Sequence, residues 1–418
     1  MTTYTPRHDD GDSTSTGGES APTDTSAAGA AATIHRVGKR AYLHHLDLIR
    51  ATTFSLVIFV HCLTQTTDEF NNLPVNTTSL LLHFTRNTFF ALTGFVLMYQ
   101  NYDKADFQTT TFWRRRIKLV IFPYLIWSAI YWLVQQVWAR GRIGELAADP
   151  IGGLREFAEL AAWGLSGFQM YFLFVMLQVY LLFPLILWLV RRTAGRHALL
   201  LGASLAVQVA ITITITWWTP PPTVAEYWWH HYATFVPYQF FILYGAVAAV
   251  HRDAIGRWLQ GKGWWLFGAL VATGTLAVGI YLGGVWFGGQ PVHDHDSAFF
   301  PWLLPFLIVA ITCLYAAAAH WGKTWREFTP RFARVVAFAS NRSFGVFLAH
   351  VLVLYFVLKP QSGDQPWILA TLGQPWGTIG TYVLTIAGSL LLMELLRRLP
   401  GSVYLTGRPR LRLRRTAA

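Results

Sequence analysis

The polypeptide alternates between long apolar stretches and short polar segments, and the stretches have the length of membrane-spanning helices. A helix needs about 20 mostly apolar residues to cross the hydrocarbon core of a bilayer. Ten stretches meet this requirement or nearly do, and the sixth is the shortest: Leu46–Gln65, Leu80–Tyr99, Ile117–Trp138, Tyr171–Val190, Ala198–Trp218, Phe235–Val250, Trp264–Phe287, Phe299–Ala319, Ser340–Leu358 and Trp376–Leu396. The pattern predicts an all-α polytopic membrane bundle of about ten transmembrane helices.

The two ends of the chain are polar. Residues 1–40 consist largely of Ser, Thr, Gly, Ala and Asp, without a continuous apolar core. Such a segment lacks the centre of a secretory signal and is typical of a disordered tail. We therefore expect a disordered cytoplasmic tail at residues 1–40, a ten-span membrane domain at residues 41–400 and a basic cytoplasmic tail at residues 401–418.

Composition and charge agree with a membrane protein. Charged residues make up 13% of the chain, where soluble proteins carry about 25%. The net charge of +12 would suggest nucleic-acid binding in a soluble protein, but here the basic residues cluster between apolar stretches, so no nucleic acid is expected. Most clusters fall on one side of the predicted topology, and only Arg86, Arg140, Arg142, Arg155 and Lys359 fall on or near the other. The positive-inside rule predicts a multi-pass cell-membrane protein with both termini in the cytoplasm.

Neither a disulfide framework nor a metal site is expected. The two cysteines, Cys62 and Cys313, lie in separate apolar stretches, which excludes a cysteine-based zinc site. The run from His293 to Asp296 alternates histidine and aspartate. It is more typical of a solvated turn than of a metal site, because no further ligand at helical spacing accompanies it.

Ionisable side chains inside the spans are the first candidates for chemistry, since each costs about 2.5–3.5 kcal/mol to insert. In the first span, Arg50 and His61 are eleven residues apart, close to three helical turns, so they share a helix face with Asp47. An imidazole can exchange a proton near neutral pH, which suits a catalytic base. Two other interpretations stay open: Arg50 as an anchor at the membrane boundary, and His61 as a packed residue bonded to a carbonyl.

At this point the sequence resembles a known family. The segment LDLIRATTFSLVIFVH is similar to the first-helix signature of membrane-bound acyltransferase family 3, in which ten residues separate an arginine from a histidine; Arg50 and His61 match it. Four further segments resemble family segments in the expected order: RNTFFALTGFVL from Arg86, FWRRRIKLVIFPYLIWSAIYW from Phe112, YFLFVMLQVYLLFPLI from Tyr171 and SFGVFLAH from Ser343 to His350. Together they cover most of residues 46–358.

The sequence departs from the family pattern in three places. The third-span motif is usually two arginines with two residues between them, whereas here Arg115 is followed at that spacing by Lys118, and Arg116 by Leu119. Tyr171 stands where a tryptophan usually opens the fourth span. A short basic segment follows the last span in place of the esterase-like domain of some members, so a stand-alone membrane domain is expected.

The resemblance implies acyl transfer at a membrane, expected to be a bacterial plasma membrane. The donor substrate is then cytoplasmic acyl-CoA, with acetyl-CoA expected, and no tightly bound cofactor is required. The acceptor is a hydroxyl of a carbohydrate or glycolipid, such as a cell-envelope glycan or a glycosylated metabolite. Because a thioester is already activated, the missing element is a base for the hydroxyl proton, and His61 is expected to supply it, with Arg50 and Asp47 as partners. The oligomeric state stays open.

Other residues acquire roles through the same resemblance. The cations Arg114, Arg115, Arg116 and Lys118 are expected to bind the phosphates of CoA through charge-assisted hydrogen bonds, although a topological anchor also explains them. The secondary candidates are Arg86, Tyr124, Tyr171, Ser343 and His350. The acceptor-binding candidates are Glu226, Trp228, Trp229 and His230, since aromatic faces and a carboxylate suit sugar rings; an interfacial aromatic belt explains them equally well.

Two different functions compete with acyl transfer. A polytopic transporter or flippase that exports a glycan or metabolite also has about ten spans with buried polar groups. Such transporters usually contain paired, interrupted helices in related halves, and this sequence shows no clear pair. A weaker alternative is an envelope-assembly component whose basic inner face binds anionic lipid.

Overall fold

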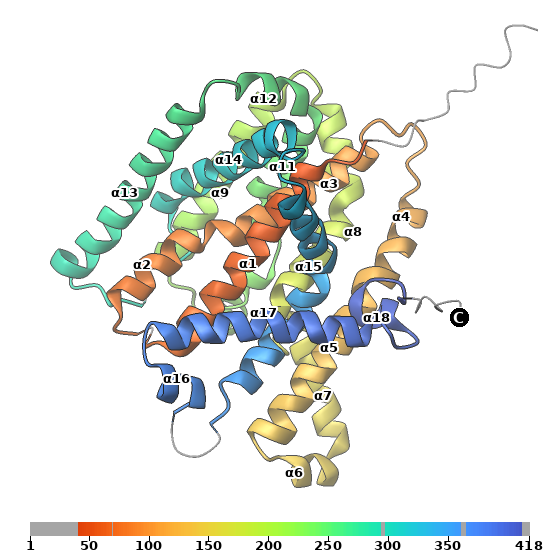
Figure 1. Cartoon of the computed structure of the whole chain (residues 1–418), viewed down its shortest axis with the longest axis vertical. Coiled ribbons are helices and arrows are strands. Elements are labelled where there is room, and N and C mark those ends of the chain that lie inside the picture. The colour runs from red at the N-terminus through yellow and green to blue at the C-terminus, as the bar shows by residue number, and fades with distance from the viewer. Residues whose placement is uncertain (1–40, 69, 294–296, 361–364, 412–418) are drawn as a thin grey trace, which may run out of the picture. The chain divides into compact units, whose positions relative to one another are not determined.

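The chain folds into helices in the computed structural model, which describes residues 41–68, 70–293, 297–360 and 365–411, apart from the side chains of Ile117 and Lys118 (Figure 1). These residues form no strand, so the all-α prediction is confirmed. The first half contains α1 (His44–Thr66), α2 (Leu73–Leu82), α3 (Phe84–Asn101), α4 (Thr109–Arg116), η1 (Ile117–Ile121), α5 (Phe122–Leu133), η2 (Val134–Ala139), α6 (Ile143–Ala148), α7 (Pro150–Trp163), α8 (Met170–Arg192) and α9 (His197–Trp217). The second half contains α10 (Pro222–Trp228), η3 (His231–Ala233), η4 (Val236–Tyr238), α11 (Gln239–Val250), α12 (Arg252–Trp258), α13 (Gly263–Gly288), η5 (Pro301–Leu303), α14 (Leu304–His320), η6 (Trp321–Trp325), α15 (Pro330–Val357), α16 (Trp367–Leu372), α17 (Trp376–Leu396) and α18 (Ser402–Thr406).

Nine helical segments of the described chain are long and apolar enough to cross a membrane: His44–Thr66, Leu73–Asn101, Thr109–Ala139, Met170–Arg192, His197–Trp217, Gly263–Gly288, Pro301–Trp325, Pro330–Val357 and Trp376–Leu396. Each overlaps a stretch predicted from the sequence. The sixth predicted stretch forms a shorter apolar helix, Val236–Val250. The predicted polytopic helix bundle is therefore confirmed.

A break divides the second spanning segment, and local sequence explains where its helices begin. The Asn72 side chain caps α2 by accepting a hydrogen bond from the Val75 amide at 3.1 Å, and Pro74 occupies the first turn. α2 ends at Leu82, and α3 starts at Phe84 after a single intervening residue, His83. Residues on both sides of His83 line a cavity.

Two glycines allow α3 and α11 to cross closely. A Cβ atom on Gly94 of α3 would lie 2.0 Å from the Ile242 carbonyl oxygen, and one on Gly245 of α11 would lie 1.8 Å from the Ala91 carbonyl oxygen. Any larger side chain would force the two backbones apart. Small residues at helix crossings have this role in membranes, where van der Waals packing replaces the hydrophobic effect between helices.

The packed interior consists of two hydrophobic clusters, and α1 contributes to both. The first is built mainly from α3, α8, α11 and α14, and the second from α1, α5, α15 and the start of α8. Phe172 of α8 packs against both clusters. The polar residues predicted on α1 therefore lie along the junction between two well-packed regions.

The C-terminal helix α18 packs on α5 rather than extending away from the helices. The Trp127 indole Nε1 donates a hydrogen bond to the Leu405 carbonyl oxygen at 2.8 Å. Ser402 and Thr406 are buried as well. The first residues of the segment expected as a basic tail thus belong to the packed helices, and residues 412–418 lie outside the described residues.

Candidate active site

His61 and His350, predicted on separate spans, lie against each other. Their rings stack with centroids 5.5 Å apart and an interplanar angle of 25°, and the Phe168 ring contacts His61 at 4.7 Å. Nδ1 of His350 lies 2.7 Å from the Phe347 carbonyl oxygen, so this nitrogen carries the proton. Nε2 of His350 is buried and has no hydrogen-bond partner in the described chain. The structure thus brings together two histidines that were separate candidates in the sequence.

The His61 ring borders a cavity of about 250 Å³, which we call the histidine chamber. Its walls come from α1, the α2–α3 break, the start of α8 and α15. The polar lining consists of Thr64, Ser79, His83, Thr85, Arg86, Gln169 and Tyr171. Within the described residues, nothing donates a hydrogen bond to the His61 ring nitrogens or accepts one from them. The imidazole is therefore available to a bound molecule.

Two polar side chains of the histidine chamber have unused hydrogen-bonding atoms. Arg86 lies over the rings of Phe299 and Tyr238, with its Cζ 4.6 Å and 5.2 Å from their centroids. Its Nε and Nη2 atoms are buried without a partner in the described structure. Gln169 is 2% exposed and lies beside the Tyr131 hydroxyl, but neither of its amide atoms completes a hydrogen bond with a described residue. Gln169 precedes the fourth apolar stretch and belongs to no motif, so the sequence pattern does not single it out.

Arg50 and Asp47 meet at the opposite end of the same face of α1. Arg50 Nη1 lies 3.4 Å from Asp47 Oδ1, and Ser340 of α15 joins them. The Ser340 hydroxyl donates to Asp47 Oδ1 at 2.6 Å and accepts from Arg50 Nη1 at 2.9 Å. Asp47 and Ser340 are buried. The sequence contained one hint to Ser340, its position three residues before Ser343 at the start of the ninth predicted span.

Arg50 faces a second cavity, also of about 250 Å³, which we call the arginine chamber. Arg116, Tyr180 and Ser343 line it as well. The Arg116 Cζ lies 5.2 Å from the centroid of the Tyr180 ring and 5.4 Å from that of Phe112. Two guanidinium groups thus border one cavity beside aromatic rings, an arrangement suited to an anionic ligand.

Three phenylalanines separate the two chambers. Phe89, Phe172 and Phe347 line both cavities. The Phe172 ring contacts Phe89 at 5.6 Å and Phe347 at 5.2 Å between centroids. These side chains, which we call the phenylalanine wall, form the partition between the arginine chamber and the histidine chamber. No hydropathy pattern distinguishes them from other core phenylalanines.

The remaining predicted residues lie elsewhere. Arg114 and Arg115 are exposed, so Arg116 is the member of the predicted cation cluster that reaches a cavity; the side chain of Lys118 lies outside the described residues. Tyr124 is buried and its hydroxyl donates to the Ala161 carbonyl oxygen, which ties α5 to α7 at a distance from both chambers.

The segment from α10 to η3 lies next to the histidine chamber, although its predicted acceptor residues do not line that cavity. Glu226 and Trp229 are exposed, Trp228 packs on Trp218 and His230 stacks on Trp163. Tyr232 contacts Tyr171 of the chamber lining at 5.1 Å between centroids. His231 contacts Phe299, the ring that covers Arg86, at 5.2 Å.

The surroundings of His231 favour its neutral form. Burial lowers its pKa from the ordinary value, and the nearby Arg86 charge lowers it further, while a hydrogen bond from its Nδ1 to the Trp228 carbonyl oxygen opposes the shift. A neutral His231 can approach Arg86 without charge repulsion.

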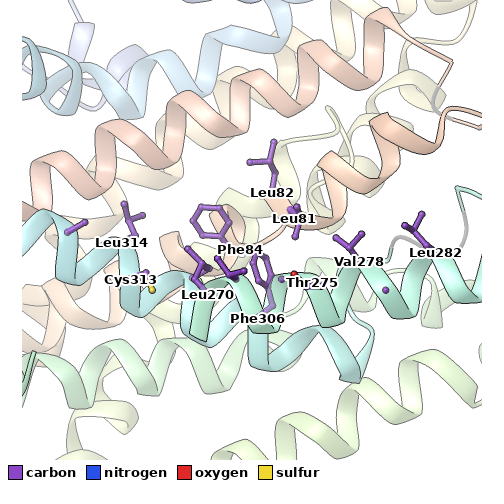
Figure 2. Close-up of a pocket in the computed structure, with 15 residues that line it drawn as sticks. Leu81, Leu82, Phe84, Leu270, Thr275, Val278, Leu282, Phe306, Cys313 and Leu314 are labelled. Carbon is purple, nitrogen blue, oxygen red and sulfur yellow. The ribbon is translucent and has the colours of Figure 1, made fainter. Parts of the chain in front are cut away.

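An apolar groove of about 860 Å³ lies outside the histidine chamber, between the α2–α3 break and the pair α13 and α14 (Figure 2). Leu81, Leu82 and Phe84 form one side, and Leu270 and Phe306 belong to the other. Leu82 also lines the histidine chamber. Leu82, the last residue of α2, therefore lies in the wall between the histidine chamber and the groove.

No group of three or more potential metal ligands gathers within the part of the chain that the structure describes. The residues Asp294, His295 and Asp296 of the outer histidine–aspartate run lie outside that part. His293 is described and contacts the Phe70 ring at 4.9 Å between centroids.

Comparison with known families gives one match. The model of acyltransferase family 3, described as an acyltransferase domain, matches residues 43–394. The match begins at the N-terminus of α1 and ends within α17, so it includes both chambers and the phenylalanine wall. Neither the comparison with curated proteins nor that with solved structures finds a significant match.

Proposed function

The chain belongs to acyltransferase family 3, whose model spans nearly all of it, and from this membership we propose that it transfers an acetyl group from acetyl-CoA to a carbohydrate hydroxyl. The family makes the protein a multi-pass membrane acyltransferase. The observation that carries the finer proposal is the pair of adjoining chambers, one bordered by two arginines and the other by an unpartnered imidazole. The proposed donor and acceptor have chemically different recognition groups, which match these two environments.

The arginine chamber is the proposed entrance for the donor. Acetyl-CoA carries phosphates at one end and its thioester at the end of a narrow pantetheine arm. Arg50 and Arg116 bind phosphate or polar groups of the donor by charge-assisted hydrogen bonds. Ser340 and Asp47 hold the Arg50 side chain in place. With the Arg50 end of α1 in the cytoplasm, as the charge distribution predicts, this chamber faces the compartment that contains acyl-CoA.

The thioester reaches His61 by passing between the side chains of the phenylalanine wall. Phe89, Phe172 and Phe347 are shared by both cavities, so rotation of one ring connects them. The acetyl group is small enough to enter a chamber of about 250 Å³ together with an acceptor hydroxyl. An apolar partition also keeps bulk water from hydrolysing the thioester.

His61 acts as the general base in the histidine chamber. Its ring nitrogens are free of hydrogen bonds to described residues, and stacking on His350 together with the edge contact to Phe168 fixes the plane of the ring. The neutral imidazole accepts the proton of the acceptor hydroxyl while the oxygen attacks the thioester carbonyl carbon. The Gln169 amide, buried and unpaired, supplies a donor and an acceptor for a second acceptor hydroxyl.

The acceptor approaches from the side of α10 and η3. Tyr232 and His231 connect this segment to the chamber through Tyr171 and Phe299. Aromatic faces of this kind stack on sugar rings. Glu226 and Trp229 are exposed beside it and can contact parts of a larger glycan that remain outside the chamber.

A labelling experiment tests the proposed function. Inside-out membrane vesicles from cells that produce the protein are incubated with acetyl-CoA that carries its radiolabel in the acetyl group. We expect label in carbohydrate, released by mild alkali as expected for an O-ester, and none above background in vesicles from cells without the protein. Absence of protein-dependent label in carbohydrate, or alkali-stable label only, would contradict O-acetyl transfer.

A further inference from the structure

Arg86 is a cation in the membrane-embedded interior without a carboxylate partner among the described residues. The aromatic rings of Phe299 and Tyr238 cover it, and the Tyr171 hydroxyl lies beside it. Cation–π contacts compensate only part of the loss of hydration, because a charged side chain within a span costs several kcal/mol unless it is paired. A protein retains such a group when it interacts with something that the folded chain alone does not supply.

Other arginines of the same protein have structural roles, because their guanidinium groups form hydrogen bonds or an ion pair between helices. Arg191 donates four hydrogen bonds to three carbonyl oxygens at and just after the end of α3, those of Asn101, Tyr102 and Lys104. Arg342 of α15 pairs with Glu394 of α17. Arg86 differs, since its Nε and Nη2 atoms are buried and have no partner in the described chain. Holding two helices together therefore does not explain why these two nitrogen atoms of Arg86 have no partner.

The location of Arg86 places its side chain at the cavity that contains the proposed base. Its side chain and His61 line the same cavity from opposite elements, the α2–α3 segment and α1. His83 and Gln169 line the same cavity, and it contains no aspartate or glutamate. A negative charge that forms next to His61 would therefore have Arg86 as its nearest fixed cation in the chamber.

We propose that Arg86 is the oxyanion-binding residue of the transfer reaction, with its guanidinium donating hydrogen bonds to the thioester carbonyl oxygen as that oxygen becomes negatively charged. This inference rests on the proposed acyl transfer. Donors fixed in advance at the position of a developing charge are the usual means of stabilising such an intermediate. Tyr238, Phe299 and Tyr171 hold the guanidinium in its plane before substrate binds.

The chemical step balances with these groups alone. The acceptor oxygen forms a bond to the carbonyl carbon and gives its proton to His61, while the carbonyl π electrons move to the oxygen held by Arg86. The carbonyl then re-forms, the carbon–sulfur bond breaks and the electron pair leaves with sulfur. The imidazolium of His61 returns the proton to the thiolate, so the products are the acetyl ester and CoA-SH.

Binding of two donor analogues to the solubilised, intact protein tests this role without an acceptor. S-ethyl-CoA lacks the carbonyl group, whereas trifluoroacetonyl-CoA carries a ketone that hydrates to a tetrahedral form. Each is titrated against radiolabelled acetyl-CoA on the wild type, Arg86→Gln, Arg86→Lys and the control Arg155→Gln, which changes an exposed arginine of α7. Thermal unfolding of each variant verifies that it is folded.

We expect Arg86→Gln to weaken trifluoroacetonyl-CoA binding about 100-fold or more and S-ethyl-CoA binding less than about threefold. Arg86→Lys should recover part of the loss, because it keeps the charge without the planar fork, and Arg155→Gln should match the wild type. Equal effects of Arg86→Gln on both analogues, or no effect on either, would overturn the oxyanion role while leaving acyl transfer intact. Failure of the wild type to bind any of the CoA compounds would instead overturn the proposed function and the inference with it.

Discussion

The imidazole rings of His61 and His350 stack at 5.5 Å between centroids, across the contact between α1 and α15. The Nδ1 atom of His350 donates a hydrogen bond to the Phe347 carbonyl oxygen of the same helix, and this bond fixes the orientation of the His350 ring. His61 borders the open cavity in front of it. The ring of His350 thus packs against the ring of His61, the member of the pair that lines the cavity.

Substitutions of His350 should distinguish a role in packing against the His61 ring from a direct role in the reaction. We expect His350→Ala to lower kcat about tenfold, because the missing ring leaves a void in which His61 loses its fixed plane. His350→Phe restores a flat ring and should keep most of the activity. Both are compared by acetyl transfer per amount of folded protein. Activity of His350→Phe as low as that of a His61 variant would show that a nitrogen of His350 takes part in the reaction.

The arginine chamber predicts which cation of the third span binds the donor. Arg116 lines the chamber, whereas Arg114 and Arg115 are exposed. Arg116→Ala should raise the KM for acetyl-CoA about tenfold or more, since one charge-assisted hydrogen bond contributes about 1.5–3 kcal/mol. Arg114→Ala and Arg115→Ala are the matched controls and should leave the KM within about twofold. A larger rise for Arg115→Ala than for Arg116→Ala would favour the assignment based on the family spacing over the one based on the cavity.

The phenylalanine wall predicts a limit on the length of the acyl group. Phe172→Ala should widen the passage and raise kcat/KM for butyryl-CoA relative to acetyl-CoA by about tenfold, because each added methylene contributes about 1–3 kcal/mol in a fitted pocket. Phe90→Ala is the control, since Phe90 packs on Phe172 at 4.9 Å but lines neither chamber. The ratio of the two donors is measured on each variant, so differences in protein yield cancel. Identical ratios in Phe172→Ala and the wild type would exclude the wall as the selective element.

Ser340 should stabilise the arrangement of Arg50 and Asp47. Ser340→Ala removes a donor to Asp47 and an acceptor for Arg50, and we expect it to lower the stability by about 1–3 kcal/mol and to raise the KM for acetyl-CoA. Ser389→Ala is the control, because the buried Ser389 hydroxyl bonds only the Thr385 carbonyl oxygen one turn earlier in α17. Thermal unfolding and donor kinetics are compared for both. A normal KM in Ser340→Ala would mean that Arg50 keeps its position without the serine.

The sequence pattern was sufficient to predict the spanning helices, but it predicted only part of the arrangement of residues in the candidate site. Apolar length located each spanning segment because every backbone polar group must be satisfied within its own helix in a bilayer. Helical periodicity placed Arg50 and His61 on one face, since both lie on one continuous helix. The adjacency of His350, the bridging by Ser340 and the choice of Arg116 over Arg115 depend on how α15 and α4 pack against α1 and α8. Those contacts are long-range and leave no periodic signal.

The contacts of the segment from α10 to η3 could also be predicted only in part. The aromatic segment from Tyr227 to Tyr232 was recognisable, but the sequence could not indicate which rings face inward. After α10, η3 brings Tyr232 against Tyr171 of the chamber lining and His231 against Phe299. The phenylalanine wall was equally hidden, since its members differ from neighbouring phenylalanines only in the cavities beside them.

The most direct test of the account is acetyl transfer by His61→Gln, which keeps the approximate size and polarity of the side chain without its basicity. With label from acetyl-CoA followed into carbohydrate in vesicles that contain equal amounts of folded protein, we expect the rate to fall about 10²–10⁴-fold, as for loss of a general base. Donor binding should remain close to that of the wild type, because the arginine chamber is separate from the histidine chamber. A His61→Gln protein that binds acetyl-CoA and transfers acetyl at the wild-type rate would contradict the central claim that His61 is the catalytic base.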